Sequence, residues 1–119
     1  MFIIKVESSF SAAHNLRGYK GKCESLHGHN WKVEVAVKSG GLNETGMVVD
    51  FHVVKAALNK TLGIFDHAYL NKIPCFKKIN PTSENIARYI YSSLKPHLRG
   101  LSSVTVWENS TCSAVYYEE

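Results

Sequence analysis

The stretch GHNWKVEVAVK, residues 28–38, decides the fold. Its large apolar side chains fall on odd-numbered positions, and its charged side chains fall on even-numbered ones. The apolar positions are Trp31, Val33, Val35 and Val37, and the charged positions are Lys32, Glu34 and Lys38. Alternation with a period of two predicts a β-strand that turns one face to a core and the other to solvent.

A second strand is predicted before it, over residues 2–14, FIIKVESSFSAAH. The alternation there is imperfect, but apolar residues return on even-numbered positions and His14 continues that parity. A polar, glycine-containing loop at 15–22 follows. A hairpin of the two strands would have a connection of roughly 13 residues, a length at which loops are often functional. That pairing would place His14 beside His27 and His29.

The rest of the chain supplies two helices and a second hairpin. The remaining predicted elements are a loop at 39–46, a helix at 48–63, an irregular segment at 64–80, a helix at 81–98, and two strands at 101–109 and 111–119. Asp50 is placed to cap the first helix and Gly63 to end it, whereas Pro81 with Thr82 or Ser83 opens the second. The element order predicts an α+β fold, a mostly antiparallel four-stranded sheet with both helices on one face. No linker or repeat divides the chain, so residues 1–119 are expected to form one domain.

Charge and composition exclude some classes of function. The net charge is +4 and the sequence pI is about 9.0. A mild positive excess suits an anionic ligand such as a phosphate ester. The basic residues are scattered and are not interleaved with aromatic side chains in a stripe, which argues against a nucleic-acid partner.

Cysteine usage and hydropathy indicate a cytoplasmic protein. The three cysteines, Cys23, Cys75 and Cys112, are odd in number and form no CxxC pair, so reduced thiols are expected. Cys75 and Cys112 are interpreted as structural, the latter within a strand. The first ten residues include charges at Lys5 and Glu7, and no stretch reaches about 18 apolar residues, so neither a signal peptide nor a membrane span is expected.

The sequence HGH at 27–29 is a candidate metal motif. In a strand, side chains two positions apart point the same way, so both imidazoles can reach one ion, and His14 on the neighbouring strand can join them. Three imidazoles with one open position are typical of catalytic zinc. The alternative is a pair of exposed histidines at the start of a strand.

Three further groups are candidates for proton transfer or ligand binding. Cys23 could be a fourth metal ligand, a base or nucleophile, or a plain loop thiol. Asp66 and His67 form either an acid–imidazole pair or a surface feature. Glu108 continues an apolar strand face, so it is either exposed at the rim or binds a cationic or amide-bearing ligand.

Taken together, these residues resemble the 6-pyruvoyl-tetrahydropterin synthase / 6-carboxytetrahydropterin synthase family. The resemblance covers almost the whole chain, and it rests on five short sequence motifs that occur in the same order as in the family. They are FSAAH at 10–14, CESLHGH at 23–29, DH at 66–67, PTSEN at 81–85 and VWEN at 106–109. One tag alone would be weak, whereas five in order are specific.

The resemblance implies a role for each matching residue. His14, His27 and His29 would bind Zn²⁺, and Cys23 would accept a proton from the substrate. Asp66 and His67 would be the partner acid–base pair on the opposite face of the substrate side chain. The residues implied to bind the pterin are Glu108, also part of the proton relay, and Thr82, Ser83 and Glu84.

The resemblance also implies a fold, an assembly and a reaction. The family's tunnelling fold is a four-stranded antiparallel sheet with two helices between strands 2 and 3. Its trimers close their sheets into a barrel and stack into hexamers, with active sites between subunits. The substrate is 7,8-dihydroneopterin triphosphate, whose phosphates Arg17, Lys20 and Lys22 could meet, although a solvated loop is the alternative for these three.

The three-residue gap between Cys23 and the HGH motif resembles the bacterial 6-carboxy-5,6,7,8-tetrahydropterin synthase type, of queuosine and deazapurine biosynthesis. Glu24 resembles the glutamate of a subgroup that forms 6-hydroxymethyl-7,8-dihydropterin for folate, and the combination of Cys23 with Glu24 resembles a subgroup with both activities; the alternative for Glu24 is a surface glutamate beside Cys23. The alternatives are 6-pyruvoyl-tetrahydropterin synthase activity and a non-catalytic zinc- or pterin-binding protein.

Overall fold

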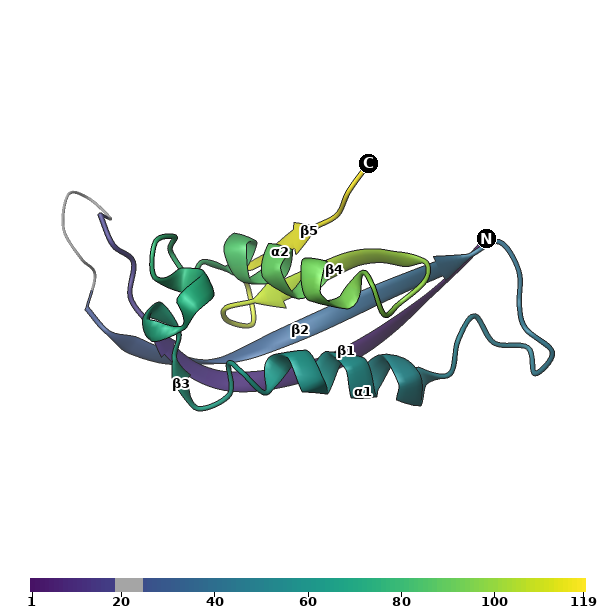
Figure 1. The fold of residues 1–119 in the computed structure, drawn as a ribbon, viewed down its shortest axis with the longest axis horizontal. Helices are drawn as coiled ribbons and strands as arrows, with labels where there is room; N and C mark the ends of the chain where they lie inside the picture. The colour runs from purple at the N-terminus through teal and green to yellow at the C-terminus, as the bar shows by residue number, and fades with distance from the viewer. Residues whose placement is uncertain (19–24) are drawn as a thin grey trace.

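The computed structural model describes residues 1–18 and 25–119 (Figure 1). The strands are β1 (Phe2–His14), β2 (His27–Ser39), β3 (Ala68–Tyr69), β4 (Leu101–Trp107) and β5 (Ser113–Tyr116). The helices are α1 (Phe51–Leu62) and α2 (Ser83–Leu94), with short 3₁₀ turns η2 (Leu70–Lys72) and η3 (Pro74–Phe76). One sheet has the order β3-β1-β2-β4-β5, and it is antiparallel except where β3 runs parallel to β1. The expected α+β fold is confirmed.

The paired strands β1 and β2 form the part of the sheet on which the core is built. The two strands pair antiparallel from Phe2 opposite Ser39 to His14 opposite His27, so the predicted hairpin is confirmed. The odd-numbered apolar residues of β2 are almost completely buried, as their alternation predicts. They pack with apolar residues of the helices and β4 into one core, which includes Val54, Leu58, Phe65, Ile86, Ile90, Val104 and Val106.

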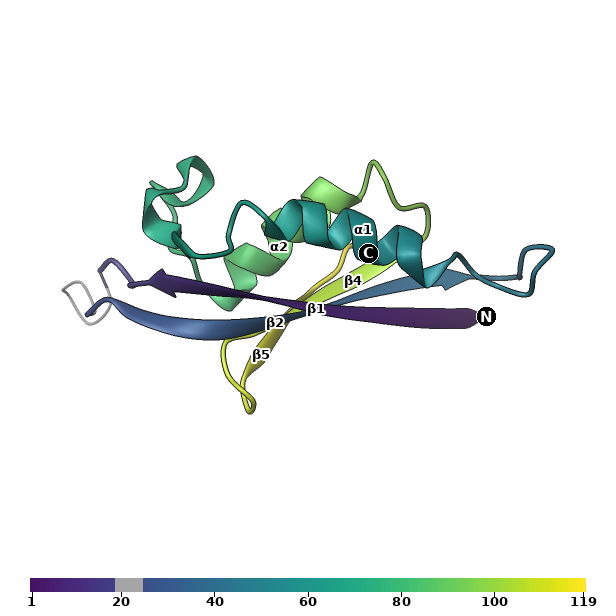
Figure 2. The same ribbon diagram turned by 90° about the horizontal axis from the view of Figure 1, so that it is seen from below.

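Both helices cover the same face of the sheet, as Figure 2 shows. Asp50 caps α1 by accepting a hydrogen bond from the backbone N–H of His52, so the helix begins three residues later than the predicted start at residue 48. Thr82 caps α2 in the same way. Each helix has 12 residues. Because a bilayer crossing needs about 20, no helix in the described part of the chain can span a membrane.

Two details of the predicted sheet are wrong. The sheet has five strands, because Ala68–Tyr69 of the predicted irregular segment pairs with the end of β1. The last hairpin is shorter than predicted, because Asn109 caps a turn between β4 and β5. Its side-chain oxygen accepts from the backbone N–H groups of Thr111 and Cys112, at 2.9 Å each. Cys112 therefore lies exposed in the turn and not within a strand.

Candidate functional site

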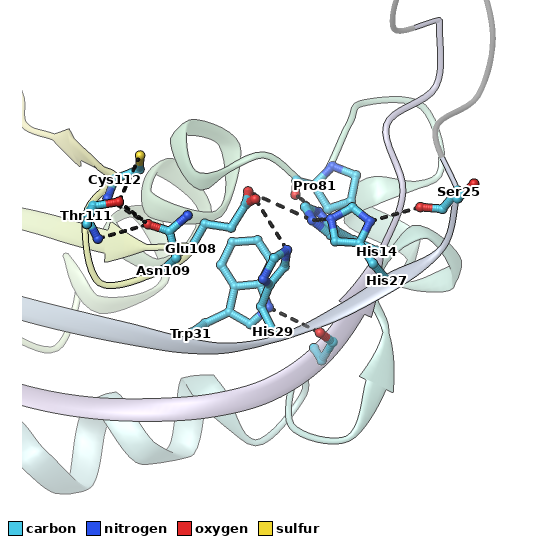
Figure 3. Close-up of polar contacts among 11 residues, drawn as sticks. His14, Ser25, His27, His29, Trp31, Pro81, Glu108, Asn109, Thr111 and Cys112 are labelled. Atoms are coloured by element: carbon cyan, nitrogen blue, oxygen red, sulfur yellow. Dashed lines mark hydrogen bonds and ion pairs between the residues drawn. The ribbon is translucent and has the colours of Figure 1, made fainter.

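Three histidines meet where β1 ends and β2 begins, on the face that the helices cover (Figure 3). His14 comes from β1, and His27 and His29 come from β2. The indole of Trp31 packs against two of them, with its ring centroid 4.8 Å from that of His14 and 5.4 Å from that of His29. The prediction that the three imidazoles lie together is confirmed, and the strand register is the cause.

Backbone carbonyls orient two of the rings. His14 donates from Nδ1 to the carbonyl of Pro81, at 2.8 Å, and His27 donates from Nδ1 to the carbonyl of Ser25, at 2.9 Å. A carbonyl only accepts, so in each neutral ring Nδ1 carries the proton and Nε2 carries the lone pair. The two Nε2 atoms are 3.1 Å apart. Two facing lone pairs repel each other unless a cation lies between them.

The third histidine and a carboxylate complete the cluster. Nε2 of His29 is buried and has no hydrogen-bond partner among residues 1–18 and 25–119. Oε1 of Glu108 lies 3.3 Å from it, close enough for an ion pair but without hydrogen-bond geometry, and Oε2 lies 3.9 Å from Nε2 of His14. Burial lowers the pKa of the His14 imidazole below its ordinary value, which favours the neutral form that metals bind.

These four residues can hold a metal ion. One ligand atom from each of His14, His27, His29 and Glu108 lies within 4.8 Å of the others. Nitrogen ligands at ~2.0–2.1 Å from a tetrahedral zinc lie about 3.3 Å apart, close to the separation of the two facing Nε2 atoms. Imidazole and carboxylate donors suit zinc and other divalent transition metals. The donor set, its spacing and the orphaned Nε2 of His29 all fit such an ion.

Glu108 reaches the cluster because of the turn that follows β4. Its backbone N–H donates to the carbonyl of Cys112, at 3.3 Å. Asn109 fixes the turn, accepting at its side-chain oxygen from the Thr111 hydroxyl at 3.0 Å as well as from two backbone N–H groups. Figure 3 shows the Glu108 side chain running from this turn to the histidines. The strand parity therefore indicated its direction correctly.

The start of α2 borders the same cluster. Pro81, whose carbonyl orients His14, directly precedes the capping residue Thr82, whose hydroxyl oxygen accepts from the N–H of Asn85 at 3.1 Å. Ser83 is half-buried, whereas Glu84 is exposed. The structure thus brings the predicted pterin-binding segment to the cluster. Sequence reasoning missed that the Pro81 carbonyl orients a histidine, because a backbone acceptor leaves no residue signature.

Asp66 and His67 lie apart from the cluster, at the β1–β3 edge. The backbone N–H of Ser11 donates to Oδ1 of Asp66 at 2.9 Å, which lowers the pKa of this carboxyl. Oδ2 lies 3.2 Å from Nδ1 of His67, whose side chain is 84% exposed. His67 lines an open depression of about 450 Å³ together with Ala13, Gly28 and His29. Ala13 and Gly28 have the opposite parity to the clustered histidines, whereas His29 is one of them, so the depression extends from the pair to one residue of the cluster.

The backbone at His67 is unusual. Its φ is 58°, in the left-handed region, and it is the one residue other than glycine with positive φ in the described part of the chain. Its N–H donates to the carbonyl of Ser11, at 2.6 Å. A non-glycine residue in this region carries strain, and such strain concentrates at functional sites. Sequence alone gives no signal for it.

The remaining candidates lie in or beside the loop between β1 and β2. Lys20, Lys22, Cys23 and Glu24 fall outside the described residues. Arg17 is described, and its guanidinium donates to the carbonyls of Asn71, Phe76 and Ile79. Arg17 therefore fastens the end of β1 to the segment before α2, and most of its donors are not available to a phosphate.

The sequence and the fold of this chain were compared with those of known proteins. The sequence profile of the 6-pyruvoyl tetrahydropterin synthase family matches residues 3–119. The 6-carboxy-5,6,7,8-tetrahydropterin synthase of Synechocystis is 44% identical over 98% of this chain and 94% of its own. That of Haemophilus influenzae is 35% identical over 99% of this chain and 100% of its own. The structure of Caenorhabditis elegans 6-pyruvoyl tetrahydropterin synthase superimposes with a TM-score of 0.84 at 30% identity, over 100% of this chain and 98% of that one. On its sequence and its fold, the chain belongs to the 6-pyruvoyl tetrahydropterin synthase family.

Proposed function

We propose that the protein is a zinc-dependent lyase that converts 7,8-dihydroneopterin triphosphate to 6-carboxy-5,6,7,8-tetrahydropterin, and that it also forms 6-hydroxymethyl-7,8-dihydropterin. The observation that carries this proposal is the set of imidazole Nε2 atoms that converge on one point with Glu108 beside them. The relatives from Synechocystis and Haemophilus influenzae, both named 6-carboxy-5,6,7,8-tetrahydropterin synthase, support the choice of product.

His14, His27 and His29 would hold the metal. When bound, the zinc would act as a Lewis acid toward the hydroxyl groups of the substrate side chain. The protein's part is to keep the rings in place. The carbonyls of Pro81 and Ser25 fix two Nδ1 protons, which leaves each Nε2 lone pair directed into the site.

Glu108 and the start of α2 would bind the pterin ring. A carboxylate accepts two parallel hydrogen bonds from the amino and ring N–H groups of an aminopyrimidine edge, and the charge strengthens both. Thr82, Ser83 and Glu84 would line the same pocket. The hydroxyl of Thr82 already caps α2, so its contribution to the pocket is to hold the helix start in place.

Cys23 and the Asp66–His67 pair would move protons at adjacent carbons of the side chain. Asp66 would orient the imidazole of His67, because its carboxylate lies 3.2 Å from Nδ1. In this proposal Glu24 provides a second base, which directs part of the flux to the hydroxymethyl product. The two products would serve queuosine and folate biosynthesis in the cytoplasm.

The site would be shared between subunits of a homohexamer built from two trimers. His67 is largely exposed and is not part of the cluster formed by the described residues, which leaves it accessible to the cluster of a partner subunit. Exposed apolar side chains give such a partner a surface to cover. Those near the start of β1 and the start of α1 are Met1, Phe2, Ile3, Met47, Phe51 and Val53.

The decisive experiment is to incubate the zinc-loaded protein anaerobically with 7,8-dihydroneopterin triphosphate and to identify the pterins by mass spectrometry. Carboxytetrahydropterin with acetaldehyde supports the proposal. Cys23→Ala should abolish that product and leave some 6-hydroxymethyl-7,8-dihydropterin. If the variant keeps zinc and fold but loses both products, Glu24 has no separate role.

The second candidate function is triphosphate elimination to 6-pyruvoyl-tetrahydropterin. The likeness to the Caenorhabditis elegans 6-pyruvoyl tetrahydropterin synthase favours it. The same mass spectra distinguish the two, since the pyruvoyl product keeps all three side-chain carbons. Bound zinc and substrate without turnover would instead indicate a binding protein.

A further inference from the structure

The backbone of β1 stays hydrogen-bonded after the strand ends, because two asparagine side chains pair with it in place of a strand. The backbone N–H of Asn15 donates to Oδ1 of Asn71 at 3.0 Å, and Nδ2 of Asn71 donates to the Asn15 carbonyl at 2.8 Å. Two residues later, the N–H of Arg17 donates to Oδ1 of Asn80 at 2.8 Å, and Nδ2 of Asn80 donates to the Arg17 carbonyl at 3.0 Å. A carboxamide offers the donor and acceptor of a peptide group, so each pair imitates one step of an antiparallel ladder.

Asn80 directly precedes Pro81, whose carbonyl accepts from Nδ1 of His14 at 2.8 Å. The carbonyl of Asn80 itself accepts from the backbone N–H of Thr82 and from Nδ2 of Asn85, at 2.9 Å each. Asn80 is therefore held through its side chain on one side and through its carbonyl on the other. The proline ring fixes the next φ, so little freedom remains for the carbonyl that His14 faces.

We propose that Asn80 is a positioning residue of the metal centre, which sets the affinity for zinc through the Pro81 carbonyl. Its pairing with the Arg17 backbone holds that carbonyl against Nδ1 of His14. The inference rests on the proposed function and deepens it, since it assigns what orients one ligand of that same site. Groups that hydrogen-bond the second nitrogen of a ligating histidine fix its tautomer and its ring orientation, and their loss weakens metal binding.

The segment that carries Asn80 has no strand of its own to join it to β1. Residues 70–82, all of them described, contain 3₁₀ turns and no strand. The guanidinium of Arg17 donates to the carbonyls of Asn71 and Phe76, at 2.9 and 2.7 Å. It also donates to the carbonyl of Ile79 at 3.2 Å. Side-chain bonds thus do here what a β-ladder does elsewhere in the sheet, and they determine where the start of α2 lies relative to β1.

The spacing of the ligand atoms makes the orientation of the ring matter. Nε2 of His14 lies 3.1 Å from Nε2 of His27, close to the separation of two nitrogen ligands on a tetrahedral zinc. A His14 ring whose Nδ1 loses its acceptor can turn and carry Nε2 away from that position. Asn80→Ala removes both bonds to the Arg17 backbone, so it should leave the Pro81 carbonyl and the ring less well ordered before the metal binds.

The test compares the wild-type chain with Asn80→Ala and with a control, Asn43→Ala. Asn43 also holds backbone through its side chain, since its Oδ1 accepts from the N–H groups of Thr45 and Met47 at 3.0 Å each. It lies in the loop that follows β2, at the opposite end of the β1–β2 pair from the histidines. Zinc affinity is measured by competition with a chromophoric chelator, and folding by far-ultraviolet circular dichroism. We expect Asn80→Ala to bind zinc about tenfold more weakly, with Asn43→Ala like the wild type.

Nuclear magnetic resonance of the Co²⁺-substituted proteins reports on the ring itself, because the paramagnetic ion shifts the signals of the imidazole N–H protons. The Nδ1 proton of His14 should exchange with water faster in Asn80→Ala than in the wild type. The Nδ1 proton of His27, which is bound to the Ser25 carbonyl, should be unaffected and serves as the internal reference. A merely structural role of Asn80 would lower stability but leave zinc affinity and this exchange rate as in the wild type, and that result would overturn the inference.

A second variant, Asn80→Asp, answers the question if the alanine variant does not fold. It keeps the size of the side chain and the acceptor for the Arg17 N–H, and it loses only the donor to the Arg17 carbonyl. Zinc binding should again be weaker, and an affinity equal to that of the wild type would count against the inference. The proposed function fails separately: a wild-type chain that binds zinc in dependence on Asn80 but forms no pterin product would refute the lyase and leave this inference standing.

Discussion

The histidine cluster and the Asp66–His67 pair belong to one proposed site, but the fold builds them in opposite ways. The cluster lies on the helix-covered face, where backbone carbonyls orient two rings and His14 is 1% exposed. The pair lies at the β1–β3 edge, exposed and on strained backbone. One chain brings the four candidate metal ligands together by itself, whereas it presents the Asp66–His67 pair outward.

Removing one ligand should produce the largest effect. We expect His29→Ala to weaken zinc binding by at least about 100-fold, because one of three nitrogen donors is lost. Its fold should survive, since Nε2 of His29 makes no hydrogen bond to any residue that the structure describes. Metal content after dialysis against a zinc buffer and far-ultraviolet circular dichroism measure the two effects.

A second histidine variant provides the control. His52 lies exposed at the start of α1, where its Nδ1 is 3.1 Å from Oδ1 of Asp50, and it is not part of the cluster. His52→Ala should keep its zinc. A His29→Ala protein that retains one zinc per chain under the same dialysis would refute the assignment of the cluster as the metal centre.

Substitution in the Asp66–His67 pair should lower the turnover rate and leave zinc binding unchanged. We expect His67→Ala to lose about 10²–10⁴-fold in kcat, as is usual when a general acid or base is removed, with zinc content unchanged. Co-expression of His67→Ala with His29→Ala then tests whether the site is shared. Hybrid oligomers combine an intact cluster from one subunit with an intact His67 from another, so activity should return. Hybrids that form but stay inactive would place both groups within one chain.

Much of the cluster could be predicted from the sequence, because strand periodicity carries the needed information. Once residues 2–14 and 28–38 are recognised as paired strands, parity puts His27 and His29 on one face, and the register that sets His14 opposite His27 adds His14 to that face. The parity of β4 indicates the direction of Glu108, which follows its last residue, but the turn held by Asn109 completes its placement. Long, alternating strands determine side-chain direction residue by residue, so no contact beyond the sheet register had to be known for the three histidines.

The edge pair could not be predicted to the same depth. Its position depends on β3, and a strand of two residues has too little pattern to detect. The positive φ of His67 depends on the path of the chain from Phe65 back to β1. No residue type in this segment indicates a left-handed conformation. Arg17 shows the same limit, since its carbonyl partners come from a segment more than 50 residues away. Contacts between distant segments of irregular backbone produce no periodic pattern in the sequence, so they cannot be predicted from it.

The strain at His67 predicts a smaller effect, on stability. His67→Gly should raise the free energy of unfolding by up to about 1 kcal/mol, because glycine adopts positive φ without a Cβ clash. His67→Ala keeps the Cβ and should show no such gain. Denaturant unfolding of the two metal-loaded variants measures the difference. Equal stabilities would mean that the surrounding contacts, and not backbone strain, determine the conformation at this edge.

The smallest expected effect concerns the Asp66 carboxylate, which is exposed but accepts a hydrogen bond from the N–H of Ser11. This bond lowers the carboxyl pKa in the folded protein below the ordinary value of 3.8, so the ionised form contributes stability above that pH. The contribution is lost as the pH falls through the lowered pKa, where the carboxylate gains its proton. We therefore expect Asp66→Asn to be slightly less stable than the wild type at pH 7, with the difference shrinking below about pH 4. Unfolding curves at several pH values check this, and a difference that stays constant with pH would mean that the charge of Asp66 does not support the β1 edge.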